Sequence, residues 1–235
     1  NNTGDRQECE LTFRDAKGAA SIWDCETGAV RDVPSAATEA NSRVKLTFAP
    51  YEAYWLVFDS VKPAVSLAPA APAWQVVAEM NSAWNVRVDP DVQPPPVGAP
   101  AALPFQDGGQ RPLESWLKWG LDRFSGFMDY TATFDANADG GRWLLDLGRV
   151  KHTAEVWVND QPVGCRLWPP FEFDVSQAVR KGPNTVRIRV GNLLCNAMRQ
   201  HVDPKNPGAV WGWVGPKDED FDAGLFGPVF VKQSR

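Results

Sequence analysis

Short strand-like runs separated by turn-forming residues are the feature that most limits how this chain can fold. Within the runs, apolar and polar residues alternate or β-branched and aromatic residues dominate, as is typical of strands. Glycine, proline, asparagine and aspartate separate them, and no long stretch keeps a helical period. The sequence therefore predicts an all-β chain of the sandwich or jelly-roll type. The predicted strands lie within residues 8–15, 20–24, 43–50, 53–60, 74–80, 84–90, 130–136, 142–148, 154–160, 171–176, 185–192 and 227–233.

The stretch AEVWVNDQPVG, residues 154–164, shows the pattern most clearly. Val156 and Val158 point to one face of a half-buried strand, and the residues between them point to the other. Asn159 and Asp160 tolerate the left-handed backbone that a tight turn requires. We expect a β-hairpin here. Helical structure is expected only as a turn or two within residues 114–124 and 175–182.

A segment rich in proline and alanine, residues 61–72, marks a boundary and suits an extended inter-domain linker. Residues 1–60 are expected to form a small β-sandwich module that leans on a neighbour or lacks an upstream strand. Residues 73–235 are long enough for a complete jelly roll. Its longest predicted loop, residues 201–224, is of the length that usually carries function in compact β domains.

Charge and hydropathy limit the possible partners. The formal net charge of −5 argues against nucleic acid and against an anionic membrane surface. No apolar run is long enough to span a bilayer, and the first residues lack the pattern of a signal peptide.

Four cysteines, at positions 9, 25, 165 and 195, do not have the spacing of zinc ligands, and only two histidines are present. Two interpretations stay open. The thiols are buried and reduced, or they form the bridges Cys9–Cys25 and Cys165–Cys195, which export would favour.

The hairpin belongs to an ordered set of motifs. A Ser-Gly and Tyr strand (124–134) precedes Asp-Leu-Gly, Val-Trp-Val-Asn, Val-Gly, Pro-Phe-x-Phe-Asp and Gly-x-Asn-x-Val (145–192), and Gly-Leu-x-Gly-Pro-Val (224–229) follows. This order resembles the sugar-binding, galactose-binding-like jelly roll of family 2 glycoside hydrolases and the related domains of family 106 α-L-rhamnosidases. Asp160 departs from the glycine common there, which should strain the turn slightly or change its type.

The first module carries a shorter set, which includes Ile22-Trp23-Asp24, residues 46–50 and Val57-Phe58. It resembles the small β-domain that follows the catalytic barrel in family 106-like enzymes. The resemblance implies the C-terminal end of a large glycoside hydrolase, rhamnosidase-like, acting on plant or microbial polysaccharide outside the cell or in the periplasm. Its implied partners are carbohydrate and the catalytic domain of the parent polypeptide.

No catalytic residue is predicted in this chain. Glycoside hydrolysis needs two carboxylates on a rigid scaffold, and the acidic run Asp218–Asp222 is typical of a solvated face. No nucleophile elbow or phosphate-binding glycine loop is present. No cofactor is expected; oxygen ligands in residues 217–222 and 105–109 would suit structural calcium, but without ordered spacing.

Two functions stay open: a carbohydrate-binding accessory region, or a structural scaffold that packs on the catalytic barrel without binding sugar. A binding module exposes aromatic rings, whereas a scaffold buries them. Trp55, Trp143 and Trp157 lie in predicted strands and are interpreted as packing residues. Trp116 and Trp119 fit either function.

The predicted carbohydrate site lies in the loop 201–224. Trp211 and Trp213 flank a glycine, and strand alternation would place both rings on one side as a platform. Asn206, Lys205 and Asp218 could then reach sugar hydroxyls. The alternative is that both rings cover the core or dock on the catalytic domain.

Overall fold

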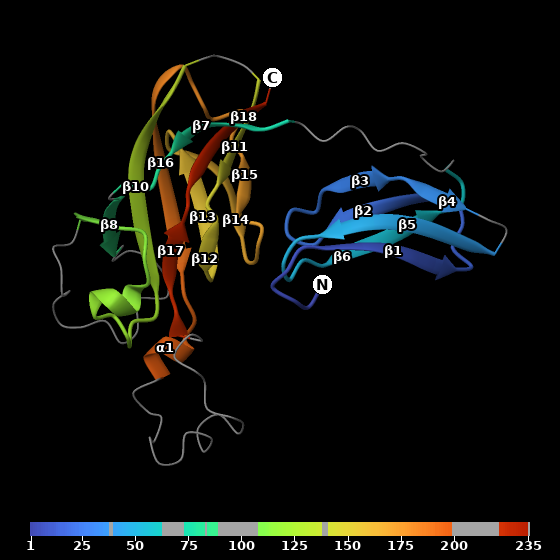
Figure 1. Cartoon of the computed structure of the whole chain (residues 1–235), viewed down its shortest axis with the longest axis horizontal. Helices are drawn as coiled ribbons and strands as arrows, with labels where there is room; N and C mark the ends of the chain where they lie inside the picture. The colour runs from blue at the N-terminus through green and yellow to red at the C-terminus, as the bar shows by residue number, and fades with distance from the viewer. Residues whose placement is uncertain are drawn as a thin grey trace, which may run out of the picture. The chain divides into compact units, whose positions relative to one another are not determined.

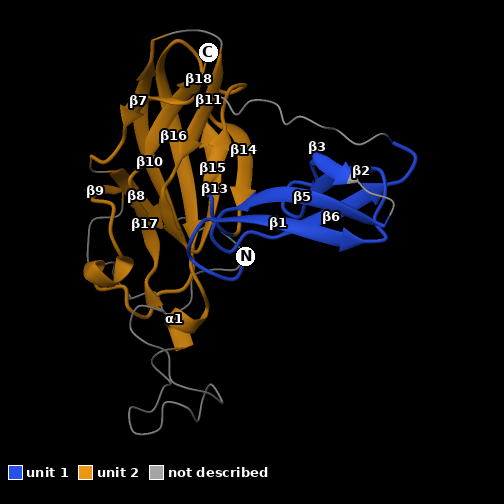
Figure 2. Ribbon diagram, turned by 45° about the vertical axis from the view of Figure 1, so that its right-hand side comes forward, with its two compact units in different colours: residues 1–72, 168–170 blue, residues 73–167, 171–235 orange. Residues whose placement is uncertain are grey.

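The computed structural model describes residues 1–37, 40–62, 73–82, 84–88, 108–137, 141–198 and 221–234. The chain divides into two units, one of residues 1–72 with 168–170 and the other of residues 73–167 with 171–235 (Figure 2). Antiparallel sheets make up both units (Figure 1), which confirms the predicted all-β class.

The first unit is a small β-sandwich of two three-stranded sheets. Phe13 and Phe58 come from different sheets, and their ring centroids lie 5.2 Å apart. The buried centre consists of Ala20, Ile22, Val33, Val44 and Leu46. One sheet has the order β1 (Gln7–Arg14), β5 (Asn41–Phe48), β4 (Ser35–Ala37), and the other the order β3 (Val30–Val33), β2 (Ala19–Asp24), β6 (Tyr54–Asp59).

The second unit is a larger sandwich of a six-stranded and a four-stranded sheet. The six-stranded sheet has the order β14 (Gln161–Arg166), β13 (Thr153–Val158), β16 (Gly182–Gly191), β10 (Phe127–Ala136), β8 (Trp84–Val88), β9 (Gly109–Arg111). The four-stranded sheet has the order β15 (Glu172–Asp174), β11 (Arg142–Asp146), β18 (Phe230–Ser234), β7 (Gln75–Glu79). A two-stranded sheet pairs β12 (Arg149–Lys151) with β17 (Gly224–Gly227).

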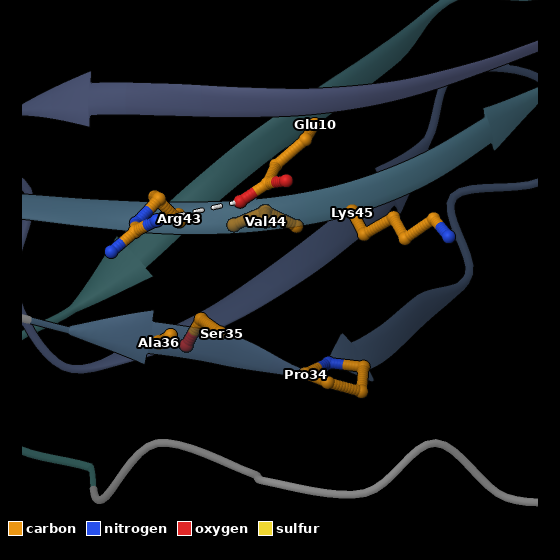
Figure 3. A pocket seen from close by; sticks show the side chains of 7 residues that line it. All are labelled: Glu10, Pro34, Ser35, Ala36, Arg43, Val44 and Lys45. Carbon is orange, nitrogen blue, oxygen red and sulfur yellow. Dashed lines mark ion pairs between the residues drawn. The ribbon is translucent and has the colours of Figure 1, made fainter.

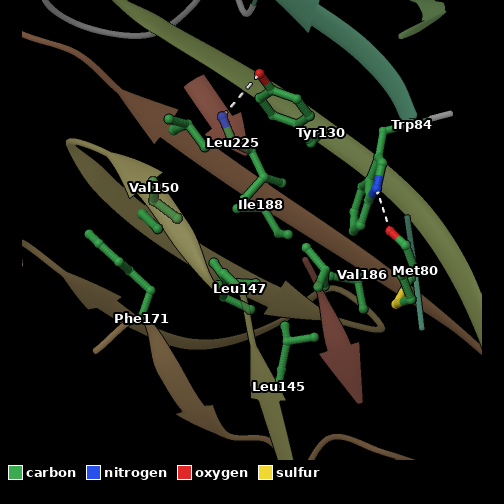
Figure 4. Packing of buried hydrophobic residues seen from close by; sticks show 14 of the residues in the cluster. Met80, Trp84, Tyr130, Leu145, Leu147, Val150, Phe171, Val186, Ile188 and Leu225 are labelled. Atoms are coloured by element: carbon green, nitrogen blue, oxygen red, sulfur yellow. Dashed lines mark hydrogen bonds between the residues drawn. The ribbon is translucent and has the colours of Figure 1, made fainter. Parts of the chain in front are cut away.

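One hydrophobic core fills this second sandwich (Figure 4). Val186 and Ile188 of β16 and Leu145 of β11 are almost completely buried, because alternate strand residues point inward. The Tyr130 hydroxyl is buried with them and accepts hydrogen bonds from Trp116 Nε1 at 2.5 Å and from the Leu225 backbone N–H at 3.5 Å. Burial raises the pKa of this phenol well above its ordinary value. Tyr130 is therefore a packing residue with a satisfied polar group.

The predicted hairpin forms between β13 and β14, and its two turn residues adopt the left-handed backbone, with φ of 52° at Asn159 and 62° at Asp160. The Asn159 side chain explains why this residue stands there. Its Nδ2 donates to the Ala178 carbonyl and to Asn184 Oδ1, both at 2.8 Å, and its Oδ1 accepts from the Thr185 backbone N–H. The side chain therefore links the hairpin to the first residues of β16 and to Ala178 in the turn before it.

Short helical turns occur where they were expected and at one further place. A 3-10 helix, η1, spans Trp116–Trp119, and a single turn follows Asp174, whose Oδ1 accepts from the Ser176 backbone N–H at 3.0 Å. The additional element is α1 (Cys195–Met198).

The cysteines correct the expectation of buried thiols. Cys25 and Cys165 are exposed, and Cys9 and Cys195 are half-buried. All four lie in the described residues and are thiols, so neither Cys9–Cys25 nor Cys165–Cys195 is bridged.

Candidate functional site

The residues predicted to bind carbohydrate, Trp211, Trp213, Asn206, Lys205 and Asp218, all lie outside the described residues. Their platform therefore stays a prediction. Of the two segments named for calcium, 105–109 and 217–222, the structure describes only residues 108, 109, 221 and 222. Among the residues that the structure describes, no group of three or more His, Cys, Asp or Glu side chains could hold a metal ion.

The described tryptophans divide into buried, half-buried and exposed ones, and Trp157 is half-buried. Trp116, Trp119 and Trp143 belong to the core, which confirms the packing interpretation of Trp143 and assigns the other two to packing as well. Trp119 Nε1 donates to Glu114 Oε1 at 2.9 Å, so its polar edge is satisfied. Trp55 is 70% exposed and Trp23 is 48% exposed. The interpretation of Trp55 as a core residue is therefore wrong.

A charged cluster occupies the outer face of the six-stranded sheet, where β10, β16 and β13 lie side by side. Asp129 of β10 stands directly opposite Arg189 of β16, and Arg187 stands opposite Trp157 of β13. Arg189 donates from Nε to Asp129 Oδ1 at 2.8 Å and from Nη2 to Oδ2 at 3.0 Å. Arg187 Nη1 lies 3.5 Å from the same Oδ2, and its guanidinium carbon lies 3.6 Å from the Trp157 ring centroid.

These contacts decide what the cluster can do. The Asp129 side chain is 1% exposed and is neutralised by two guanidinium groups, so it is not available as a nucleophile or proton donor. Arg187 covers one face of the Trp157 ring, which is a favourable cation–π geometry. The arrangement fixes side chains across three strands. It is suited to stabilising the sheet rather than to chemistry.

Other described carboxylates are also bound to cations. Lys232 Nζ lies 2.6 Å from Asp146 Oδ2, and Arg149 Nη2 lies 3.0 Å from Asp222 Oδ2. Burial raises the pKa of the Asp174 carboxyl, but the hydrogen bonds from Ser176 and the ion pair with Arg142 outweigh it and hold the pKa below its ordinary value. A general acid in a glycosidase needs the opposite shift. These carboxylates are therefore poor candidates for that role.

His152 is held in its neutral form. Burial, together with the adjacent Lys151 charge, lowers the pKa of its imidazole to about 4. Its Nε2 atom is buried and has no hydrogen-bond partner among the described residues. Because a charged imidazole would be desolvated there, His152 is not a proton donor near neutral pH.

A hollow of about 510 Å³ lies in the first unit beside β1, β4 and β5 (Figure 3). Glu10 and Arg43 form an ion pair of 3.7 Å across it, and both side chains are more than half exposed. Exposed pairs of this kind contribute little energy. The lining lacks the buried polar groups that usually orient a ligand, so we do not assign a site to this hollow. It is lined by Glu10, Pro34, Ser35, Ala36, Arg43, Val44 and Lys45.

The exposure of Trp23 and Trp55 was not predicted, although part of the signal is present in the sequence. In β2, Ala20 and Ile22 alternate with Ser21 and Trp23, and the polar Ser21 marks the outward face. Trp23 shares that face. In β6, Trp55 and Val57 share their face with Asp59, and this one polar residue at the end of the strand is only a weak sign that Trp55 faces outward.

The chain is similar to parts of sugar-cleaving enzymes. It aligns over 100% of its length with a rhamnosidase from Novosphingobium sp. PP1Y, at 28% identity and a TM-score of 0.73. It is 36% identical over 93 residues to the "Putative beta-glucuronidase" of Formosa agariphila. A β-glucuronidase of an uncultured Clostridium species aligns with 72% of the chain at 20% identity and a TM-score of 0.47, over 30% of its own length.

The chain spans only a small part of these proteins. It covers 22% of the rhamnosidase, and the second similarity covers 37% of this chain and 8% of the relative. No family model matches the chain. The resemblance to domains of rhamnosidases and family 2 glycoside hydrolases, expected from the motifs, is confirmed. Among the described residues, no helix is long and apolar enough to cross a membrane.

Proposed function

We propose that this chain is a non-catalytic accessory region of a rhamnosidase-like glycoside hydrolase and that it binds carbohydrate. The observation that carries the proposal is the alignment of the whole chain with about a fifth of a rhamnosidase, at a TM-score of 0.73. A region of this size that keeps both β units of a much larger enzyme is best explained as a module that serves a catalytic domain elsewhere in the polypeptide.

The proposed ligand is a plant or microbial polysaccharide on which the parent enzyme acts, outside the cell or in the periplasm. Sugar rings present C–H faces to aromatic side chains and hydroxyls to polar groups. Trp211 and Trp213 are proposed as one such aromatic surface, with Asn206, Lys205 and Asp218 as hydroxyl partners.

The second candidate function is a scaffold that packs on the catalytic domain without binding sugar. The burial of Trp116, Trp119 and Trp143 favours it, because these rings pack in the core of the second unit and cannot stack on a sugar. The two functions differ in one measurable property, which is the affinity of the chain for glycans.

The test uses the full chain and a set of oligosaccharides that includes rhamnose-containing glycans. We expect Trp211→Ala and Trp213→Ala each to lower glycan affinity at least tenfold while the melting temperature stays the same. Tyr51→Ala is the matched control, because it removes an exposed ring of the first unit. Absence of binding to every oligosaccharide would favour the scaffold. Cleavage of aryl rhamnosides that depends on an acid of this chain would refute the non-catalytic assignment.

A further inference from the structure

We infer that Trp23 and Trp55 form a second saccharide-binding platform, on the outer face of the β3-β2-β6 sheet. The inference rests on the proposed carbohydrate-binding function and assigns to it a site in the first unit. Trp23 of β2 pairs directly with Trp55 of β6. The two side chains are 48% and 70% exposed, the only tryptophans above a third exposed among the described residues.

The strand register makes the two rings neighbours. Residues directly opposite each other in an antiparallel pair point to the same face, with Cβ atoms about 5 Å apart. On the other side of β2, Trp23 pairs with Val30 of β3, which is 58% exposed. At this register the face therefore carries an apolar residue on each of three strands, namely Val30, Trp23 and Trp55.

Hydrogen bonds hold the first of the two indoles in place. Trp23 Nε1 donates to Ser21 Oγ at 3.3 Å, and Ser21 Oγ lies 3.5 Å from the Val57 carbonyl oxygen, to which it donates. Ser21 precedes Trp23 by two residues on the same face, so the indole leans along the strand toward Ser21 while the residue stays 48% exposed. A ring held in this way loses little side-chain entropy when a ligand stacks on it.

The size of the surface fits a sugar better than a protein. With about 250 Å² for a fully exposed tryptophan, the exposed parts of the two rings amount to about 300 Å². A stable protein interface needs about 800 Å² on each partner. One or two pyranose rings would cover the exposed area of the two tryptophans, and the C–H faces of these sugars pack well on aromatic rings.

An acidic residue beside the two tryptophans indicates which class of sugar the platform prefers. Asp32 of β3 stands opposite Ser21, on the same face as Trp23, and is exposed. A carboxylate at this place accepts hydrogen bonds from hydroxyls and repels a uronate. The platform should therefore prefer a neutral saccharide chain to an acidic one.

The test measures binding of the full chain to a neutral rhamnose-containing oligosaccharide and to a uronate oligosaccharide of equal length. We expect Trp23→Ala and Trp55→Ala each to lower affinity for the neutral probe at least tenfold, with a change in melting temperature of less than about 2 °C. Phenylalanine at either position should retain much of the affinity, because it keeps an aromatic face. Tyr51→Ala should bind as the unaltered chain does.

Oxidative footprinting gives a second measurement that needs no variant. Bound neutral glycan should slow oxidation of Trp23 and Trp55. Equal oxidation rates with and without saturating glycan would overturn the platform, as would full affinity in the double alanine variant. If Trp23→Ala and Trp55→Ala leave affinity unchanged while Trp211→Ala or Trp213→Ala lowers it, the platform is wrong and the proposed function stands. If the unaltered chain binds neither probe, the carbohydrate-binding function itself fails.

Discussion

Replacement of Asp129 by asparagine should destabilise the second unit, because it removes the charge at the centre of the outer-face cluster. The carboxylate is 1% exposed, and both of its oxygens accept hydrogen bonds from Arg189, at 2.8 and 3.0 Å. Loss of one partner from a buried ion pair costs about 3–5 kcal/mol. The Arg187 and Arg189 side chains are 29% and 19% exposed, and asparagine still accepts one hydrogen bond. We therefore expect the free energy of unfolding to fall by about 2–3 kcal/mol.

The corresponding fall in melting temperature is about 4–12 °C for a domain of this size. Thermal unfolding followed by near-ultraviolet circular dichroism would measure it, since the signal reports the packing of buried aromatic rings. Asp135→Asn is the matched control, because Asp135 is an exposed residue of the same strand. If the two variants melt within 1 °C of each other, the Asp129 cluster does not stabilise the fold and the reasoning is refuted.

Three further predictions concern other sites. The pKa of His152 falls from its ordinary value of 6.5 to about 4 on folding, so the free energy of unfolding should be highest above pH 6.5 and decrease as pH falls toward 4. His152→Gln should remove this His152-dependent decrease from the free energy of unfolding measured in denaturant at each pH. Asp160→Gly should raise the free energy of unfolding by about 0.5–1 kcal/mol, since φ is 62° there; a loss of stability in urea titrations would contradict this. Cys25 and Cys165 should react with a thiol reagent in the native protein before Cys9 and Cys195, as peptide mapping can show.

The fold was largely predictable because its signals are local. Alternation in β13 and β16 fixes which side chains face the core, and Asn159 with Asp160 supplies the left-handed turn between β13 and β14. The strands that the sequence did not indicate, β3, β4, β9, β12 and β17, have no more than four residues. Such short strands depend on pairing with other parts of the chain, and their own residues carry too little pattern to reveal them.

The charged cluster was not predictable because its partners are distant in sequence. Asp129 and Arg189 are separated by 60 positions, and only the pairing of β10 with β16 brings them together. The exposure of Trp55 depends on a similar long-range fact. Apart from Asp59 at its end, β6 is apolar or aromatic on both faces, and its pairing with β2 determines which face is turned toward the core.

The two units treat the tryptophans of their outer sheet faces in opposite ways. In the second unit, Arg187 lies 3.6 Å from the Trp157 ring centroid and is held there by Asp129, so a sugar would have to displace a bound guanidinium to stack on that face. Such a displacement costs the cation–π interaction, about 0.5–2 kcal/mol, before any sugar contact forms. Trp23 and Trp55, in contrast, are 48% and 70% exposed. Of these three tryptophans, only the two of the first unit are therefore open to stacking by a sugar without displacement of a guanidinium.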